Sequence, residues 1–198
     1  MLVSFEGLDG SGKTTQVERL RARLEAEGRT VVTAREPGGT PLGEQLRALV
    51  LHGSEMTAWA EALLYAAARA ELVAEIVAPA LERGDDVVLD RYVDSSVAYQ
   101  GVGRGLGLDE VLELNLQAVG GLLPDRTFVL EVDTALSGSR VGASPDRIER
   151  EERDFHVTVA GGYRRLAELF PERVVLLDGT LPAETLAARI HDELRRPA

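Results

Sequence analysis

The chain has 198 residues, 44% of them hydrophobic, so it can bury one sizeable core, and a single domain over residues 1–198 is expected. The formal net charge of -11, from 22 basic and 33 acidic residues, argues against a general affinity for nucleic acid or for an anionic membrane. Cysteine is absent, which excludes disulfides and thiolate metal sites, and the sequence indicates neither an export signal nor a membrane span, so we expect a cytoplasmic protein.

Short apolar runs alternate along the chain with longer patterns of helical periodicity. This alternation predicts βαβ units around a parallel sheet, that is, an α/β fold. The expected strands are residues 2–5, 30–34, 87–90, 127–132 and 173–177. The expected helices are residues 14–27, 42–52, 57–82, 108–121, 148–169 and 182–195. Because ligands of such folds bind beyond the carboxyl ends of the strands, the residues at strand ends are the candidates for chemistry.

The first strand leads directly into a glycine-rich loop with the pattern G-x-x-x-x-G-K-[ST]. Its glycines let backbone N–H groups turn inward around an anion, Lys13 adds a positive charge, and the Thr14 hydroxyl can ligate Mg²⁺. A helix that begins near Thr14 points the positive end of its dipole at the same anion. The sequence therefore predicts a nucleotide phosphate site, the alternative being a glycine-rich turn with a solvated lysine. The candidate residues are Gly7, Leu8, Asp9, Gly10, Ser11, Gly12, Lys13, Thr14 and Thr15.

Residues 35–41 follow the second expected strand. Two prolines and two glycines make this segment a rigid turn, and the charged residues beside it indicate a place for a second ligand. The alternative is an ordinary loop between a strand and a helix. Arg47, on the helix that follows, either points back toward this cleft or is solvated.

The third expected strand ends at Asp90 and Arg91. In a protein with a phosphate-binding loop, an acid at this place can hold the Mg²⁺ shell, and an arginine can fork onto a phosphate. The alternative is that the two side chains pair with each other. Upstream, Tyr65 and Arg69 lie four residues apart on one helix face, where a ring can stack on a nucleobase and a guanidinium can donate to a base carbonyl. Core packing with a surface charge is the alternative for that pair.

Together these segments resemble the thymidylate kinase family, whose members phosphorylate dTMP with ATP. The resemblance covers nearly the whole chain, and it rests on residues 5–15, 35–40, 64–69, 90–92, 95–101 and 146–149. It implies a P-loop NTPase fold with a five-stranded parallel sheet flanked by helices on both faces, a mobile lid, and a homodimer. It also implies ATP and dTMP as substrates, with Mg²⁺ bound near Thr14 and Asp90.

The resemblance also implies roles for individual residues. Arg69 and Gln100 would contact the thymine, and Ser96 would line its pocket. Arg91 would bind the dTMP phosphate, and Tyr99 would lie where a ribose 2′-hydroxyl would clash. The expected substrate-binding residues are Asp9, Glu36, Pro37, Arg47, Tyr65, Arg69, Arg91, Ser96, Tyr99 and Gln100.

Transfer to a phosphate acceptor needs no general base, so we expect catalysis to depend on Mg²⁺, Lys13, Arg91 and a further arginine. Residues 8–11 contain no arginine, and the resemblance points instead to a lid over about residues 138–150, whose glycines, serines and proline suit a closing loop. Arg140 is the first candidate and Arg147 the second, and the alternative is that neither is decisive.

Two other functions are considered. A kinase for another nucleoside monophosphate would keep the loop and Asp90 but lose the Tyr65 and Arg69 pair and the stretch 96–100. A non-catalytic nucleotide-binding protein with the same loop would have no use for a second, built pocket.

Overall fold

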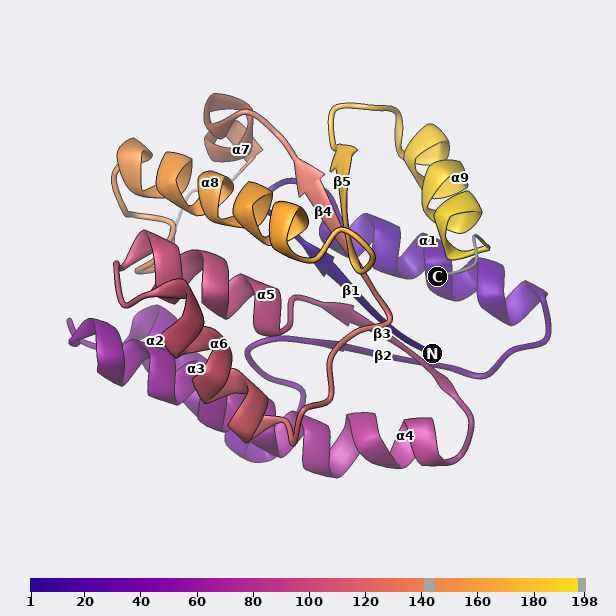
Figure 1. The fold of residues 1–198 in the computed structure, drawn as a ribbon, viewed down its shortest axis with the longest axis horizontal. Coiled ribbons are helices and arrows are strands. Elements are labelled where there is room, and N and C mark those ends of the chain that lie inside the picture. The colour runs from indigo at the N-terminus through magenta and orange to yellow at the C-terminus, as the bar shows by residue number, and fades with distance from the viewer. Residues whose placement is uncertain (141–144, 196–198) are drawn as a thin grey trace.

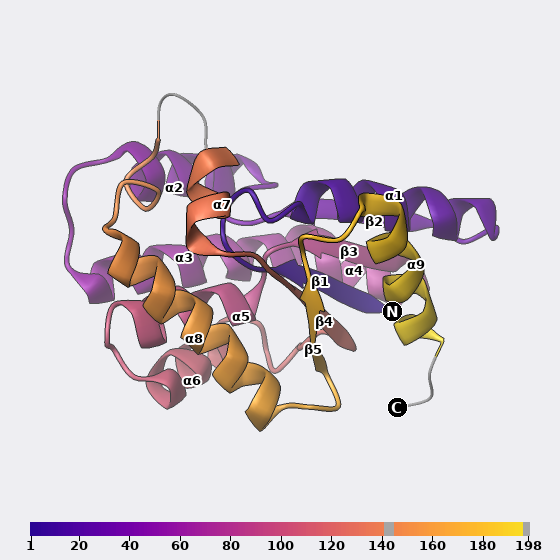
Figure 2. The ribbon, with the colours of Figure 1, turned by 90° about the horizontal axis from the view of Figure 1, so that it is seen from above.

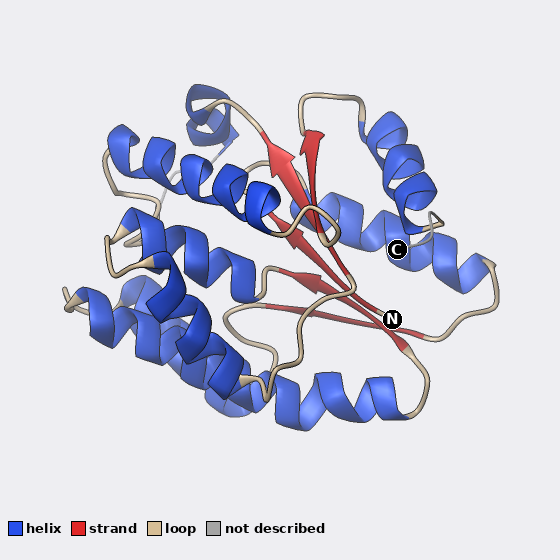
Figure 3. Cartoon of the chain, in the orientation of Figure 1, coloured by secondary structure: helices blue, strands red, loops and turns tan. Residues whose placement is uncertain are grey.

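The computed structural model describes residues 1–140 and 145–195, and it has a five-stranded sheet in which every pairing is parallel (Figure 3). The strands are β1 (Leu2–Glu6), β2 (Val31–Arg35), β3 (Asp86–Asp90), β4 (Arg126–Glu131) and β5 (Val174–Asp178). Their order in space is β2-β3-β1-β4-β5. Each predicted strand is confirmed, because its observed bounds lie within one residue of the expected ones.

One face of the sheet is covered by α1 (Lys13–Ala26) and α9 (Ala183–Leu194), which lie next to each other in Figures 1 and 2. The alternation of side chains along a strand sends Val3 and Phe5 of β1 to this face. There they join the apolar stripes of the two helices in one buried cluster, which includes Val17, Leu20, Leu24, Leu186 and Ile190.

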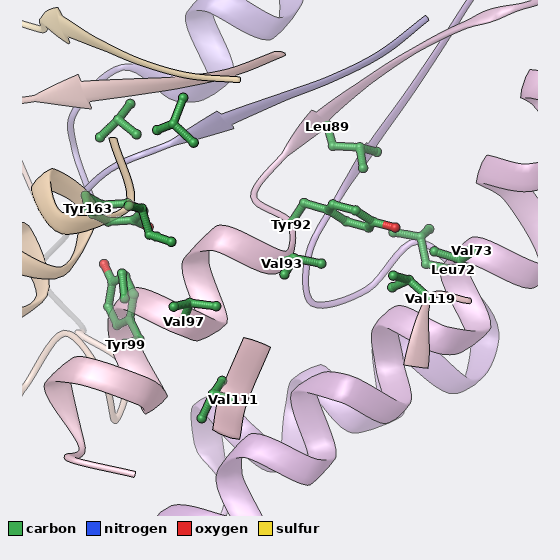
Figure 4. Packing of buried hydrophobic residues seen from close by; sticks show 14 of the residues in the cluster. Leu72, Val73, Leu89, Tyr92, Val93, Val97, Tyr99, Val111, Val119 and Tyr163 are labelled. Atoms are coloured by element: carbon green, nitrogen blue, oxygen red, sulfur yellow. The ribbon is translucent and has the colours of Figure 1, made fainter. Parts of the chain in front are cut away.

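The opposite face carries the larger part of the core. It is covered by α3 (Ala58–Leu72), α5 (Val93–Ser96), α6 (Leu108–Ala118) and α8 (Arg153–Leu169). In Figure 4 the ring of Tyr92 lies between Leu89 of the sheet and Leu72 of α3. The helix α2 (Pro41–His52) packs on α3, and its first turn is capped by Thr40, whose hydroxyl accepts from the Gly43 amide at 2.9 Å. Helices on both faces of the sheet were expected and are confirmed.

The single helix expected over residues 57–82 is a helical path of three parts. A π-helical segment, η1 (Val73–Val77), joins α3 to α4 (Ala78–Glu82). Pro79 in the first turn of α4 has no N–H to give to the carbonyl four residues back, and the wider π turn accommodates that missing bond.

Two helical segments were not predicted. Residues 93–103 form α5 followed by a second π-helical segment, η2 (Val97–Gly103), and residues 134–140 form α7 (Thr134–Arg140) where the mobile lid was expected to begin. Both segments are short and rich in small residues, so neither has the long apolar periodicity by which a helix is recognised.

The helix expected from residue 148 begins five residues later, at Arg153. Before it, the Asp146 carboxylate accepts from the amides of Ile148 and Glu149 at 2.8 and 2.9 Å, and the Glu149 carboxylate accepts from the Asp146 amide at 2.8 Å. These bonds close residues 146–150 into a turn. Residues 141–144 of the expected lid lie outside the described part of the chain. No helix within the described residues combines the length and the apolar character needed to cross a membrane.

Candidate active site

The site is created by the pairing of β1 with β3. Phe5 lies opposite Asp90 in the parallel register, and the Arg91 amide donates to the Phe5 carbonyl at 2.9 Å, so the glycine-rich loop after β1 meets the residues that follow β3. A cavity of about 420 Å³ lies at this edge of the sheet. Its lining residues are Asp9, Gly10, Gly12, Lys13, Thr14, Thr15, Arg35, Glu36, Pro37, Arg47, Leu51, Tyr65, Arg69, Asp90, Arg91, Ser95, Ser96, Tyr99, Gln100, Asp146 and Ile148.

The cavity is locally cationic although the chain is acidic overall. Five basic side chains line it against four carboxylates, whereas the whole sequence has a net charge of -11. Every expected substrate-binding residue belongs to this lining. Of the expected loop residues, Gly7, Leu8 and Ser11 lie behind it. A concave site of this size with convergent polar groups suits a nucleotide better than a flat surface would.

The glycine-rich loop has the backbone conformation of an anion nest. Gly7, Gly10 and Gly12 have φ angles of 129°, 72° and 97°, which side chains rarely permit. At Gly7 the constraint is also steric, because a Cβ atom would lie 2.5 Å from the Leu130 carbonyl oxygen. Gly12 is the residue before α1, so the loop amides and the amino end of the helix face the same space.

Lys13 is buried in this loop and is the only lysine of the sequence. Its Nζ donates to the carbonyl oxygens of Leu8 at 2.9 Å and Gly7 at 3.2 Å. Burial, followed by the charge of Arg91, lowers the pKa of Lys13 to about 8. A bound polyphosphate would reverse that effect, because its negative charge favours the ammonium form.

Thr14 and Asp90 are joined by a hydrogen bond of 2.6 Å from the hydroxyl to the carboxylate. The described residues contain no cluster of three or more His, Cys, Asp or Glu side chains that could hold a metal alone. A hydroxyl beside one carboxylate is nevertheless a donor set that fits Mg²⁺, since this ion keeps several waters and takes its other ligands from substrate phosphates. The two residues are therefore the ones that would hold Mg²⁺ with a nucleotide.

Arg91 pairs with the loop rather than with its neighbour Asp90. Its guanidinium lies 2.6 Å from Asp9, 3.1 Å from the Ser95 hydroxyl and 5.1 Å from the centre of the Tyr99 ring. Burial alone would raise the pKa of Asp9, but the charges of Arg91 and Lys13 outweigh it and lower that pKa to about 2. The backbone of Arg91 has φ 72°, a left-handed conformation that costs about 1 to 3 kcal/mol and is typical of functional sites.

Arg69 is 1% exposed, and its donors are occupied by the protein. Nε and one terminal nitrogen contact the Glu36 carboxylate at 2.7 and 2.6 Å. The remaining donors reach the Ser96 hydroxyl at 2.9 Å, the Tyr92 carbonyl at 3.1 Å and the Asn115 side chain. Because a guanidinium has five N–H groups, a direct contact with a nucleobase would require it to give up one of these bonds. Contact with thymine stays a prediction, while Arg69 itself is part of the wall that fixes Glu36 and Ser96.

The residues after β3 reach the cavity through α5 and η2. The π-helical segment η2 places both Tyr99 and Gln100 in the cavity lining. In Figure 4 the Tyr99 ring lies beside that of Tyr163, whose centroid is 6.4 Å away. Arg47 points toward the cavity, as one of the two sequence interpretations had it, and donates to the Pro37 carbonyl at 2.8 Å.

Comparison with known proteins identifies the group to which the chain belongs. A family profile described as Thymidylate kinase matches residues 5–190. The chain belongs to the thymidylate kinase family. A thymidylate kinase of Bifidobacterium longum (strain DJO10A) is 49% identical over an alignment of 203 positions, and this alignment covers 100% of this chain and 98% of the relative. One of Deinococcus radiodurans is 47% identical over 193 residues, 96% of this chain and 94% of the relative. The crystal structure of the thymidylate kinase from Ehrlichia chaffeensis superposes with a TM-score of 0.82 at 31% identity, covering 98% of each chain.

Of the two arginines expected in the lid, the structure describes the side chain of Arg147 but not that of Arg140. The side chain of Arg140, at the end of α7, lies outside the described part of the chain. Arg147 is buried and does not line the cavity; its guanidinium lies 2.7 Å from Glu61 and donates to the Val50 carbonyl at 3.0 Å. One of its terminal nitrogens is enclosed without a partner among the described residues. In this arrangement Arg147 binds the turn at residues 146–150 to α3.

Sequence reasoning missed a group of residues behind Arg91. Glu6 is buried and accepts from the Tyr92 amide at 2.8 Å, from the Ser95 hydroxyl and from the Tyr163 hydroxyl at 3.2 Å. Burial, with the charge of Asp94, raises the pKa of Glu6 to about 8. Glu6 could have been found from the sequence, because it is a charged residue at the end of a mostly apolar strand. No sequence signal pointed to Tyr163, because its position also fits the apolar stripe of α8.

The lowered pKa of Lys13 predicts that ATP binding takes up protons at about pH 8.5. In the protein without ATP, Lys13 is largely neutral at this pH, and the phosphates of bound ATP restore its charge. The affinity for ATP should therefore fall as the pH rises through about 8. Calorimetry in two buffers of different ionisation enthalpy measures the uptake. Lys13→Met is the control and should lose the part of the uptake that is due to Lys13, the single lysine of the sequence. Equal uptake by both proteins would contradict the prediction.

Proposed function

We propose that this chain transfers the γ-phosphate of ATP to dTMP, giving dTDP and ADP, as a step of dTTP synthesis. The observation that carries the proposal is that one cavity includes both a phosphate-binding loop and the side chains Tyr65, Tyr99 and Gln100, which suit a second nucleotide. Arg91 contacts both groups, because it pairs with Asp9 of the loop and packs on Tyr99. Membership of the thymidylate kinase family supports the identity of that second nucleotide.

The chemistry requires little of the protein beyond positioning and charge. An oxygen of the dTMP phosphate attacks the γ-phosphorus of ATP, the bond from phosphorus to the β,γ-bridging oxygen breaks, and ADP leaves with that oxygen. The acceptor oxygen is already anionic near neutral pH, so no general base is needed. The main barrier is the repulsion between two polyanions, and fixed cations in a water-poor site lower it.

We assign the cationic groups of the cavity to the two substrates separately. Lys13 and the loop amides bind the ATP phosphates, and Arg91 binds the phosphate of dTMP. Mg²⁺, when bound, neutralises charge on the phosphates, and Thr14 and Asp90 are the residues that would hold it. A phosphate that binds Arg91 would compete with Asp9 for the guanidinium. Before substrate binds, Asp9 therefore neutralises the charge of Arg91 and holds its side chain in place.

The nucleobase end of the site is built from α3, α5 and η2. Tyr65 offers a ring for stacking, and Ser96 and Tyr99 close the wall beside it. We assign to Tyr99 the exclusion of a ribose 2′-hydroxyl. Arg69, which also lines the cavity, supports this wall through its bonds to Glu36 and Ser96.

We further propose that the protein is a homodimer and acts in the cytoplasm. Trp59 and Leu63 lie four residues apart on α3 and are 45% and 53% exposed, which supports contact with a second copy through this helix face. Fractionation of the source cells would test the cytoplasmic location.

A coupled assay that detects ADP tests the function. With ATP and Mg²⁺ supplied, we expect turnover with dTMP to exceed that with dAMP, dGMP and dCMP, and to be lost when EDTA removes the metal. Faster turnover with another monophosphate would assign the enzyme to a different acceptor. Nucleotide binding without consumption of any monophosphate would reduce it to a nucleotide-binding protein.

Alanine variants of the two expected lid arginines separate a catalytic role from a structural one. Arg140→Ala should lower kcat and kcat/KM together by about 10³-fold, because an arginine that acts on the transferring phosphoryl group contributes in the transition state. Arg147→Ala should instead lower the free energy of unfolding by about 2 kcal/mol, since it removes a bond to the buried Glu61, and should change kcat by less than about tenfold. Steady-state kinetics and urea unfolding separate the two effects. If Arg140→Ala kept kcat within about threefold of the parent, the arginine would have to be sought at Arg150 or Arg153.

The dimer is tested by light scattering on the purified protein. Leu63→Glu places a charge in the proposed interface and should give a monomer, whereas the parent should have twice that mass. Val157→Glu is the control, because this residue of α8 is similarly exposed, at 52%, on another helix. A monomeric parent, or dissociation of the control as well, would exclude this interface.

A further inference from the structure

Glu61 of α3 lies behind the cavity wall and receives hydrogen bonds from three side chains. The Gln100 amide nitrogen lies 2.9 Å from Oε1, and guanidinium nitrogens of Arg104 and Arg147 lie 3.1 and 2.7 Å from Oε2. Glu61 is 1% exposed and does not belong to the cavity lining, whereas Gln100 does. The contact between Glu61 and Gln100 therefore joins a buried charge to a residue that lines the cavity.

The charge state of Glu61 fixes the direction of that hydrogen bond. Burial alone would raise the pKa of Glu61, but the hydrogen bonds from Arg104 and Gln100 outweigh it and hold the pKa below its usual value. An ionised carboxylate only accepts hydrogen bonds. The Gln100 side chain must consequently turn its NH₂ group toward Glu61, and the two ends of the amide, which are otherwise interchangeable, become distinct.

The carbonyl end of Gln100 is left for the ligand. Among the described residues, no group donates a hydrogen bond to Gln100 Oε1. A carbonyl oxygen presented to a pyrimidine selects a base whose ring nitrogen carries hydrogen. Thymine and uracil have such a donor at N3, whereas cytosine has a bare acceptor there, which the carbonyl would repel.

We propose that Glu61 is a positioning residue for nucleobase selection, because it holds the Gln100 amide with its carbonyl oxygen toward the base and so favours pyrimidines with an N3–H group over cytosine. The inference rests on the proposed function and deepens it. Glu61 touches no substrate itself, and its effect passes through Gln100 alone.

The test compares kcat/KM for dTMP, dUMP and dCMP, with ATP as donor. In Glu61→Gln the new amide can donate to Gln100, so the Gln100 side chain is free to turn its NH₂ group to the base. We expect the ratio of dTMP to dCMP to fall by about tenfold or more. The values for dTMP and dUMP should fall in parallel because both bases carry the N3 donor, and KM for ATP should stay unchanged.

Two further variants separate positioning from a structural role. Arg104→Met removes one cation from Glu61 but leaves Arg147, whose guanidinium keeps the carboxylate ionised, and the bond to Gln100. Stability should therefore fall while the ratio stays within about twofold of the parent. Gln100→Leu removes the amide and leaves the bonds of Glu61 to Arg104 and Arg147, so it tests the reading of N3 even if Glu61→Gln fails to fold. In the Gln100→Leu background, Glu61→Gln should change the ratio no further.

Four results would overturn the inference. They are a Gln100→Leu variant with the parent ratio, a folded Glu61→Gln variant with the parent ratio, an Arg104→Met variant that loses as much selectivity as Glu61→Gln, and additive effects of Glu61→Gln and Gln100→Leu. Each requires a parent that phosphorylates dTMP. A parent without that activity contradicts the proposed function instead, so the two failures are distinguishable.

Discussion

The pairing of β1 with β3 is the interaction on which the rest of the site depends. Parallel strands end at the same edge of a sheet, and this register brings the glycine-rich loop after Glu6 against the residues that follow Asp90. The contacts of Thr14 with Asp90 and of Asp9 with Arg91 exist only because these two strands are neighbours. Lys13, Thr14, Asp90 and Arg91, which are assigned to phosphate and metal binding, are all positioned by this one juxtaposition.

The same site shows how an acidic chain keeps cations in place. Moving a guanidinium out of water costs several kcal/mol unless a partner compensates it. Arg69, Arg91 and Arg147 each have a carboxylate within 2.7 Å, supplied by Glu36, Asp9 and Glu61 respectively. These pairs add little net stability, but they hold each side chain in one orientation, and that preorganisation is what a site for two polyanions requires.

Helix α3 combines the nucleobase wall with its support. Glu61, Tyr65 and Arg69 recur every four residues and therefore share one side of the helix. Only Tyr65 and Arg69 line the cavity, while Glu61 stands behind Gln100 and binds the turn that precedes α8 through Arg147. Gln100 of the cavity wall and Arg147 of the turn at residues 146–150 are thus both held by one buried carboxylate.

The sequence by itself determined the sheet and the phosphate-binding loop, because these depend on local signals: apolar strand runs, glycines at fixed spacing, and polar residues where strands end. Most of the remaining cavity lining was implied by the resemblance of its segments to the thymidylate kinase family. Only the tertiary structure decided how the side chains are used. It paired Arg91 with Asp9 rather than Asp90, enclosed Arg69 among protein partners, and buried Arg147 against Glu61. It also formed the π-helical segment that brings Tyr99 and Gln100 into the cavity lining. The physical reason is that a sequence motif shows only which chemical groups are available at a site. The partner of each charged group depends on distances between segments that lie far apart in the chain. Those distances are fixed only when the core has packed.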